Sequence, residues 1–425
     1  RPVMRPAASR SAPSQMLFGR PPPAPPAPPA PPPTTPATAI IQRDLLGYAS
    51  LLALGVVPAV DWVSLIGPEA VNPARLVYFS LIAVGSVYLG VQRQDIGEAS
   101  PIDGRSAALA PVFASVTLGG LYLVIKYTGL NPGALYQFFA CLFALLAASD
   151  ILQPIAGLGL AGALLDNPAE QPYGEEREAQ IMNSGAAPAF ALALAVVVGY
   201  AQGPVSTGGA LSLPVFAALN NLLGWSICMA SLGVLALDSF VAAASLLGGL
   251  FVYDAFFVFK SDVMVTVATQ IEAPAKFLFA AVREAGDTRY PFSVLGLGDV
   301  VVPGAFVSLL RQVDIDGLEA DTGGARPSAR PAAATSAPKS AAETSEVVDF
   351  AYFYTGVAAY AAGLAATFVA NYVTKAGQPA LVYIVPSLLL AALATAARRG
   401  ELPQLLAYTS QRAEAAKVKR DELKA

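Results

Sequence analysis

Residues 246–259 read LLGGLFVYDAFFVF, and residues 294–302 read VLGLGDVVV. Each stretch sets one aspartate, Asp254 or Asp299, among apolar side chains. A charged side chain in the hydrocarbon core of a bilayer costs at least about 2.5 kcal/mol, so each aspartate needs an explanation. Glycines precede both aspartates, which lets neighbouring helices approach closely. The two stretches predict consecutive membrane-spanning helices, each with an aspartate near its middle.

The composition of the chain agrees with this reading. Hydrophobic residues make up 55% of the 425 residues and charged residues 13%, about half the charged share of a soluble protein. The mean hydropathy is +0.54. We predict an all-α fold, a polytopic membrane helical bundle. Its ten apolar blocks, most of them close to the roughly 20 residues of a spanning helix, are 45–65, 76–91, 107–127, 134–152, 187–202, 219–237, 239–259, 291–310, 351–373 and 381–397.

Histidine is missing from the chain. Serine–histidine pairs, cysteine–histidine pairs and HExxH zinc sites all need an imidazole, so these catalytic classes are excluded. Cys141 and Cys228 both lie in apolar blocks, where single buried thiols are expected in preference to a disulfide. We expect no metal and no cofactor. If the protein is an enzyme, carboxylates must carry the acid–base chemistry.

Four regions follow one another along the chain. Residues 1–39 are rich in Pro, Ala and Arg, which predicts a disordered arm or a transit peptide. Residues 40–75 hold an extra apolar segment, either a span or a signal. Residues 76–400 form the predicted bundle, interrupted by a disordered loop at 312–349. Residues 401–425 are a charged tail.

The distribution of basic residues predicts the orientation of the bundle. With ten spans and both termini inside, and leaving out the five arginines before residue 44, 14 basic residues lie inside and 7 outside. Cytoplasmic loops carry an excess of Lys and Arg. The C-terminus is therefore expected on the cytoplasmic or stromal side.

Asp254 and Asp299 have a definite chemical use if their carboxyls face each other. Two close carboxylates share a proton because they cannot both ionise easily. The ionised member can take a proton from water while the protonated member donates to a peptide carbonyl, as in aspartic proteases. A structural hydrogen-bonded pair or a pair on an ion pathway explains the two residues equally well at this point.

Three motifs stand in order along the chain: Tyr253-Asp254, Gly296-Leu297-Gly298-Asp299, and Gln378-Pro379-Ala380-Leu381. They resemble the YD, GxGD and PAL motifs of intramembrane aspartyl proteases. The surrounding sequence, from about residue 76 to residue 397 and including Asn220-Asn221, is similar to the signal peptide peptidase branch more than to presenilin.

The resemblance implies a nine-span protease that cleaves within transmembrane segments, notably remnant signal peptides and type II membrane proteins. Asp254 and Asp299 would be its catalytic pair and Tyr253 would line the cavity. The Gly296-Leu297-Gly298 segment would give the substrate access, and Gln378-Pro379-Ala380-Leu381 would shape the site.

Proline at position 379 has a further expected role. Because proline lacks an N–H and resists helix, Pro379 should keep the entrance to the last span extended. Free backbone groups near Ala380 and Leu381 could then pair with an unwound substrate as an added strand.

The expected partners are transmembrane helical peptides and the lipid bilayer, with no nucleic acid; homo-oligomer formation stays open. The resemblance implies the endoplasmic reticulum or endomembranes, whereas the Arg/Pro/Ala-rich beginning favours a plastid membrane. Two other functions compete. One is a proton-coupled transporter or channel that uses the same aspartates, against which the PAL motif argues. The other is a catalytically idle scaffold that binds membrane proteins, against which the intact motifs argue.

Overall fold

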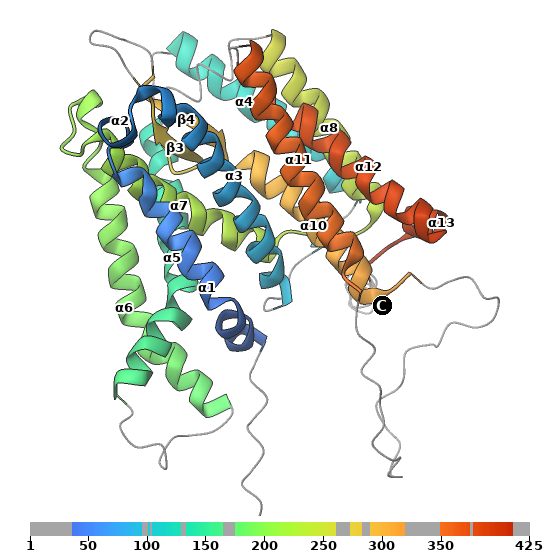
Figure 1. Ribbon diagram of the computed structural model, residues 1–425, viewed down its shortest axis with the longest axis horizontal. Coiled ribbons are helices and arrows are strands. Elements are labelled where there is room, and N and C mark those ends of the chain that lie inside the picture. Colours follow the sequence, from blue (N-terminus) through green and yellow to red (C-terminus); the bar gives the residue numbers. More distant parts are fainter. Residues whose placement is uncertain are drawn as a thin grey trace, which may run out of the picture.

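The computed structural model describes residues 36–95, 101–102, 104–128, 133–164, 175–260, 273–282, 290–318, 349–374 and 377–410. Helices dominate this part of the chain (Figure 1). The helices are α1 (Pro36–Val56), α2 (Trp62–Ile66), α3 (Pro68–Gln92), α4 (Gly104–Thr128), α5 (Gly133–Leu164), α6 (Glu175–Ala201), α7 (Leu213–Val234), α8 (Phe240–Lys260), α10 (Gly298–Asp316), α11 (Ala351–Thr374), α12 (Leu381–Arg399) and α13 (Leu402–Ala407). Short 3₁₀ turns are η1 (Val57–Ala59), η2 (Arg93–Asp95) and η4 (Val205–Thr207), and the strands are β1 (Pro101–Ile102), β2 (Ala236–Leu237), β3 (Lys276–Ala280) and β4 (Phe292–Gly296).

Seven helices within the described residues are long and apolar enough to cross a membrane. They are α3, α7, α11 and α12 over their whole length, and Gly133–Gly157 of α5, Asn183–Ala201 of α6 and Phe240–Val258 of α8. The predicted polytopic helical bundle is confirmed. Most of the predicted arm, of the loop at 312–349 and of the charged tail lies outside the described residues. Residues 36–39 of the arm belong to α1 and residues 312–316 of the loop to α10, so these parts are helical.

The first apolar block, 45–65, is not one continuous helix. The chain leaves α1 at Val56, turns through η1 with the buried Pro58 in it, and starts α2 at Trp62. Asp61 caps that short helix, because its carboxylate accepts a hydrogen bond from the Ser64 N–H at 3.4 Å. A proline and a capping residue thus divide the block.

The block at 291–310 also differs from its prediction. Residues Phe292–Gly296 form β4, which pairs antiparallel with β3, and α10 begins only at Gly298. Asp299 therefore lies in the first turn of a helix, not near the middle of one. The apolar run 292–297 suits a buried strand as well as a helix, and periodicity cannot separate the two over so short a run.

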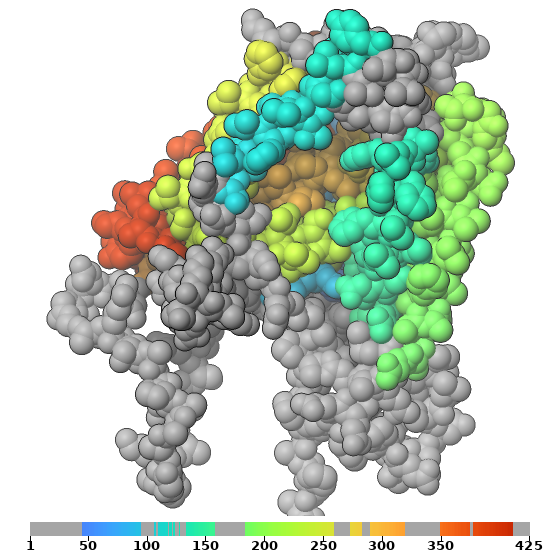
Figure 2. All heavy atoms as spheres, turned by 180° about the vertical axis from the view of Figure 1, so that it is seen from behind, coloured from blue at the N-terminus to red at the C-terminus, as the bar shows by residue number. Residues whose placement is uncertain are grey.

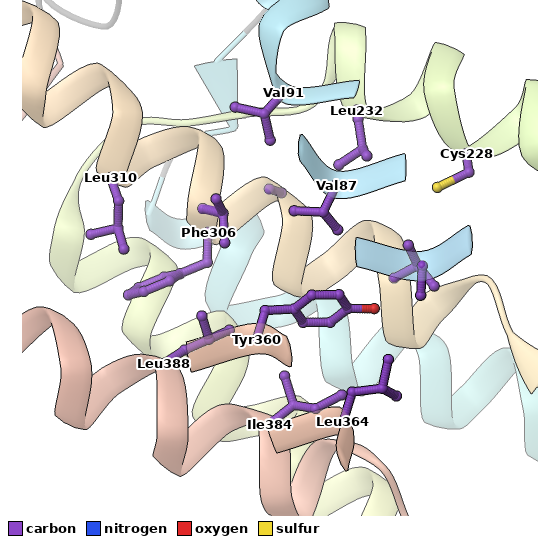
Figure 3. Close-up of a cluster of buried hydrophobic side chains, with 14 of the residues drawn as sticks. Val87, Val91, Cys228, Leu232, Phe306, Leu310, Tyr360, Leu364, Ile384 and Leu388 are labelled. Atoms are coloured by element: carbon purple, nitrogen blue, oxygen red, sulfur yellow. The ribbon is translucent and has the colours of Figure 1, made fainter. Parts of the chain in front are cut away.

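Five helices meet in the core (Figure 3). Val87 of α3, Leu232 of α7, Phe306 of α10, Tyr360 of α11 and Ile384 of α12 are all fully buried there. Lipid tails are as apolar as these side chains, so close packing, not exclusion of water, holds such helices together. This core fixes the start of α10 relative to α11 and α12.

Two further helix pairs lie around this core: α5 packs along α6, and α4 packs along α8. Viewed from behind, the molecule has a hollow between α4 and α5 (Figure 2). Orange atoms of the segment from residue 290 to residue 318 are visible in its floor. Part of the segment that carries the GxGD motif is thus open to that face.

Candidate active site

Asp254 lies on α8 and is 4% exposed. Its Oδ2 atom accepts a hydrogen bond of 3.0 Å from the backbone N–H of Leu381, the first residue of α12. The YD and PAL motifs, 127 residues apart in the chain, are thus joined directly. No other described residue bonds to this carboxyl, so its Oδ1 atom is left for another partner.

Asp299 is half-buried in the first turn of α10. The N-terminal end of a helix carries partial positive charge, which favours a carboxylate there. The Tyr360 hydroxyl of α11 donates a 3.1 Å hydrogen bond to the Asp299 carbonyl and holds this turn in place. The helices α8 and α10, which carry the two aspartates, contact each other, and both contact α12. The structure thus brings all three motifs together.

The glycines of the GxGD motif leave room around Asp299. A Cβ atom on Gly296 would lie 3.4 Å from the Asp299 Oδ2 atom, so a larger side chain there would press on the carboxyl. Gly298 is exposed and a Cβ atom on it would meet nothing within 4 Å. Leu297 is buried, and its N–H donates to the carbonyl of Ala275 at 3.1 Å. That bond anchors the motif to the strand hairpin.

The PAL segment differs in one respect from its prediction. Gln378 and Pro379 are not helical, as expected for the entrance to the last helix. The backbone groups after them are not free, however: the Leu381 N–H bonds to Asp254, and the Ala380 carbonyl accepts from the Ile384 N–H at 3.1 Å. The Leu381 N–H and the Ala380 carbonyl are therefore already paired within the protein. The pairing of this segment with an unwound substrate stays a prediction.

Gln378 links two helices by hydrogen bonds, whereas Tyr253 packs against an aromatic ring of its own helix. The Gln378 side chain donates to the Thr374 hydroxyl at 2.9 Å and accepts from the Tyr383 hydroxyl at 3.1 Å, so it links the end of α11 to α12. Tyr253 is half-buried, and its ring lies 4.7 Å from that of Phe257 on the same helix.

Two asparagines of α7 bind the outer edge of β3. The Leu278 N–H donates to the Asn221 Oδ1 atom, and the Asn221 Nδ2 atom donates to the Leu278 carbonyl, both at 2.7 Å. Asn220 donates to the Lys276 carbonyl at 2.6 Å. Their place in an apolar block was the signal in the sequence, since a buried amide needs polar partners.

On the outer edge of β4, no described side chain forms such hydrogen bonds with the strand backbone. Leu278 lies opposite Val294, and its backbone groups point away from β4 towards Asn221. In an antiparallel pair the residue opposite such a position also points its groups outward. The N–H and carbonyl of Val294 therefore point away from β3, and Val294 is 43% exposed. The sequence predicted a helix over these residues, so this exposed strand edge was not expected.

The described residues gather no cluster of metal ligands around the aspartates. Within the part of the chain that the structure describes, no three His, Cys, Asp or Glu side chains form a group that could hold a metal ion. Cys141 and Cys228 are both free thiols, which confirms that they form no disulfide with each other; Cys228 is buried and Cys141 half-buried.

Known proteins are similar to this chain over the region that contains this site. The family described as signal peptide peptidase matches residues 94–412, which include all three motifs. The chain belongs to the signal peptide peptidase family. The human signal peptide peptidase is 29% identical to it over 371 residues, 85% of this chain and 83% of the human protein. A probable intramembrane protease of Schizosaccharomyces pombe is 29% identical over 77% of this chain and 92% of its own length. The intramembrane protease 2 of Caenorhabditis elegans is 38% identical over 195 residues, 45% of this chain and 38% of its own length.

Membership in the signal peptide peptidase family supports a protease of the intramembrane kind, built as an integral membrane protein. The family assignment suggested by the three motifs is confirmed. The competing assignment to a transporter has no support from these relatives.

Proposed function

We propose that this protein is an aspartic endopeptidase that hydrolyses peptide bonds within transmembrane segments, and that Asp254 and Asp299 are its catalytic pair. Its substrates would be remnant signal peptides and type II membrane proteins. The proposal rests most on one contact, the hydrogen bond from the Leu381 N–H to the Asp254 carboxyl. This hydrogen bond orients a buried carboxyl, and apolar packing alone gives no reason for a carboxyl at that position. The bond uses the Oδ2 atom, so the Oδ1 atom is available to a water molecule.

The proposed reaction uses the two carboxyls in turn. One carboxylate removes a proton from water, and the oxygen attacks the carbonyl carbon of the scissile peptide. The other carboxyl donates its proton to the carbonyl oxygen, which gives a tetrahedral diol. Return of a proton to the nitrogen then breaks the C–N bond and releases an acid and an amine. No covalent intermediate with the protein is needed.

A transmembrane substrate must also be unwound before water can reach its carbonyl. Each backbone group that is opened in an apolar site is costly unless it finds a partner. The outward N–H and carbonyl of Val294 on β4 offer such partners, five residues before Asp299. We propose that the substrate pairs with this edge as an added strand.

Replacing Asp254 or Asp299 by Asn tests the catalytic pair. Asparagine keeps the shape of the side chain but cannot exchange a proton, so either variant should lose cleavage of a transmembrane peptide by the purified protein. Asp61→Asn is the matched control, because Asp61 is exposed and Asn caps a helix as well as Asp. It should cleave at the wild-type rate.

Other results would favour the alternatives. Cleavage by either Asn variant at the wild-type rate would contradict the aspartic mechanism. A folded wild-type protein that binds the peptide and never cleaves it would indicate the idle scaffold. Proton flux in sealed vesicles, lost in the same variants and without cleavage, would indicate the transporter.

Val294→Pro tests the strand. Proline is tolerated on an edge where its missing N–H faces away from the sheet, so the hairpin should persist while one donor to the substrate is lost. We expect kcat/KM to fall, whereas Val294→Ala, which keeps the N–H, should be near the wild type. If both variants behave alike, substrate does not pair with this edge.

A further inference from the structure

A groove with a volume of about 850 Å³ lies between α3 and α11, and neither of the two aspartates lines it. These helices contact each other and lie side by side on the face shown in Figure 1. The wall on α3 is largely apolar and includes Leu76 and Leu81, and the wall on α11 includes Ala365, Phe368 and Val369. In a bilayer, this lining faces lipid tails.

One end of the groove is polar and carries both signs of charge. Glu69, Asn72 and Tyr372 line the groove, and Arg75 and Asn371 line a smaller pocket that shares Asn72 and Tyr372 with it. This end lies where α3 begins and α11 ends. Both helix ends are expected at the level of the lipid headgroups, since that is where spanning helices reach water.

The length of the groove matches one leaflet of a bilayer. Glu69 and Leu81 mark its two ends on α3, and twelve residues of α-helix extend about 18 Å. Half of the hydrocarbon core is about 15 Å thick.

We propose that this groove binds one zwitterionic glycerophospholipid, such as phosphatidylcholine. Its phosphate would contact Arg75 with help from Asn72 and Asn371, because a guanidinium and amides donate hydrogen bonds to phosphate oxygens. Its cationic amine would contact Glu69 and the exposed Tyr372 ring, an ion pair and a cation–π contact. One acyl chain would lie in the apolar part. An anionic headgroup that lacks the amine would leave Glu69 facing a negative charge.

The site is connected to the candidate active site. Arg75 also donates a hydrogen bond from its Nη1 atom to the Ser293 hydroxyl of β4. The Phe368 ring in the groove lies 6.4 Å from the Phe79 ring, which lies 6.5 Å from the Phe279 ring of β3. The bound lipid would thus brace the hairpin that leads to Asp299. This consequence, unlike the binding itself, rests on the proposed function.

Photocrosslinking of the purified full chain in detergent tests the binding. The probe is phosphatidylcholine with a diazirine on one acyl chain, and mass spectrometry identifies the labelled peptides. We expect label on α3 and α11. Ala365→Trp should fill the groove and reduce that label at least tenfold, and so should Leu81→Trp. Ala366→Trp is the matched control, since Ala366 is exposed, next in sequence and not part of the lining.

Competition with unlabelled lipid tests the headgroup. Phosphatidylcholine should displace the probe about tenfold better than phosphatidylglycerol, and Glu69→Gln should remove that preference. Label spread evenly over the spans, or unchanged in both groove-filling variants, would overturn the proposal, and so would equal displacement by the two lipids. Displacement by a transmembrane peptide but not by phosphatidylcholine would assign the groove to substrate. None of these readouts depends on cleavage.

Discussion

Gly363 sets how closely α11 approaches α12 beside the candidate active site. A Cβ atom on Gly363 would lie 2.6 Å from the Ile384 Cα atom and 3.1 Å from the Tyr383 carbonyl oxygen. Both neighbours are backbone atoms, which cannot rotate away. Carbon atoms in contact need about 3.5 Å, so Gly363→Ala should push the two helices apart by about 0.9 Å.

This displacement is large relative to the contacts of the site. Ile384 lies one helical turn after Leu381, whose N–H holds the Asp254 carboxyl at 3.0 Å. Stretched by about 0.9 Å, that contact would no longer be a hydrogen bond. Overpacking costs about 1–3 kcal/mol of stability, and a misplacement of about 1 Å at a catalytic group can lower the rate about 100-fold.

The assay compares Gly363→Ala with Gly120→Ala in thermal unfolding and in cleavage of a transmembrane peptide. Gly120 lies on α4, and a Cβ atom on it would meet nothing within 4 Å. This control should gain about 0.5–1 kcal/mol from helix propensity and keep its activity. If Gly363→Ala gained the same stability and cleaved normally, the close approach of α11 and α12 would not position Asp254.

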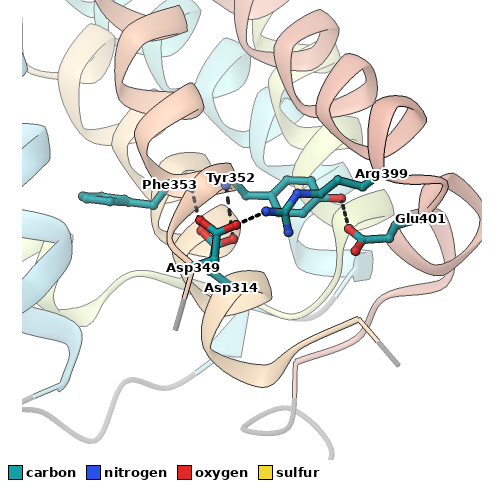
Figure 4. A network of polar contacts seen from close by, with 6 residues as sticks. All are labelled: Asp314, Asp349, Tyr352, Phe353, Arg399 and Glu401. Carbon is teal, nitrogen blue, oxygen red and sulfur yellow. Dashed lines mark hydrogen bonds and ion pairs between the residues drawn. The ribbon is translucent and has the colours of Figure 1, made fainter. Parts of the chain in front are cut away.

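Three further predictions concern the PAL segment, the orientation and the network in Figure 4. Pro379→Leu should extend α12 backwards and reduce cleavage, more for a stiff substrate helix than for a sharply bent one. A C-terminal tag should be digested from the cytoplasmic or stromal side of sealed vesicles. Asp314 accepts hydrogen bonds from the Tyr352 N–H at 3.1 Å and the Phe353 N–H at 2.7 Å. Asp314→Asn should therefore lower the free energy of unfolding by about 1–2 kcal/mol, measured by thermal unfolding.

Each of these predictions has a result that contradicts it. Wild-type cleavage of both substrates by Pro379→Leu would make the proline only a helix start. A tag protected on the expected side would reverse the orientation. Asp349 is the control for Asp314, because its side chain is 70% exposed in its ion pair with Arg399, and exposed pairs contribute about 0–1 kcal/mol. Equal effects of Asp314→Asn and Asp349→Asn would contradict the capping role.

Long apolar blocks predicted most of the fold, because a bilayer leaves helices almost no alternative. The segment before Asp299 was mispredicted for a related reason. The block 291–310 is apolar enough for a span, but residues 292–296 pair with β3 as a strand instead of continuing the helix. That choice depends on Asn221, which occupies the other edge of β3. The position of Asn221 in an apolar block indicates that its amide has a polar partner, but not that this partner lies 57 residues away in the chain.

For the candidate site, too, the sequence predicted some features and not others. The motifs identified Asp254 and Asp299 because charged residues in apolar blocks need an explanation. The role of Leu381 could not be predicted, since an N–H donor is a property of every residue except proline. Only the position of α12 beside α8 directs that N–H to Asp254. The Tyr360 hydroxyl that holds the Asp299 turn is equally invisible in a sequence of apolar helices.

The central claim is that two aspartates hydrolyse a peptide bond inside a membrane segment. Its most direct test is to incubate the purified protein with a synthetic signal-peptide-like helix in detergent and to identify the fragments by mass spectrometry. We predict that the wild type cuts within the apolar stretch and that Asp299→Asn gives no fragments. Fragments from the polar ends alone, or the same apolar cuts by Asp299→Asn, would contradict it.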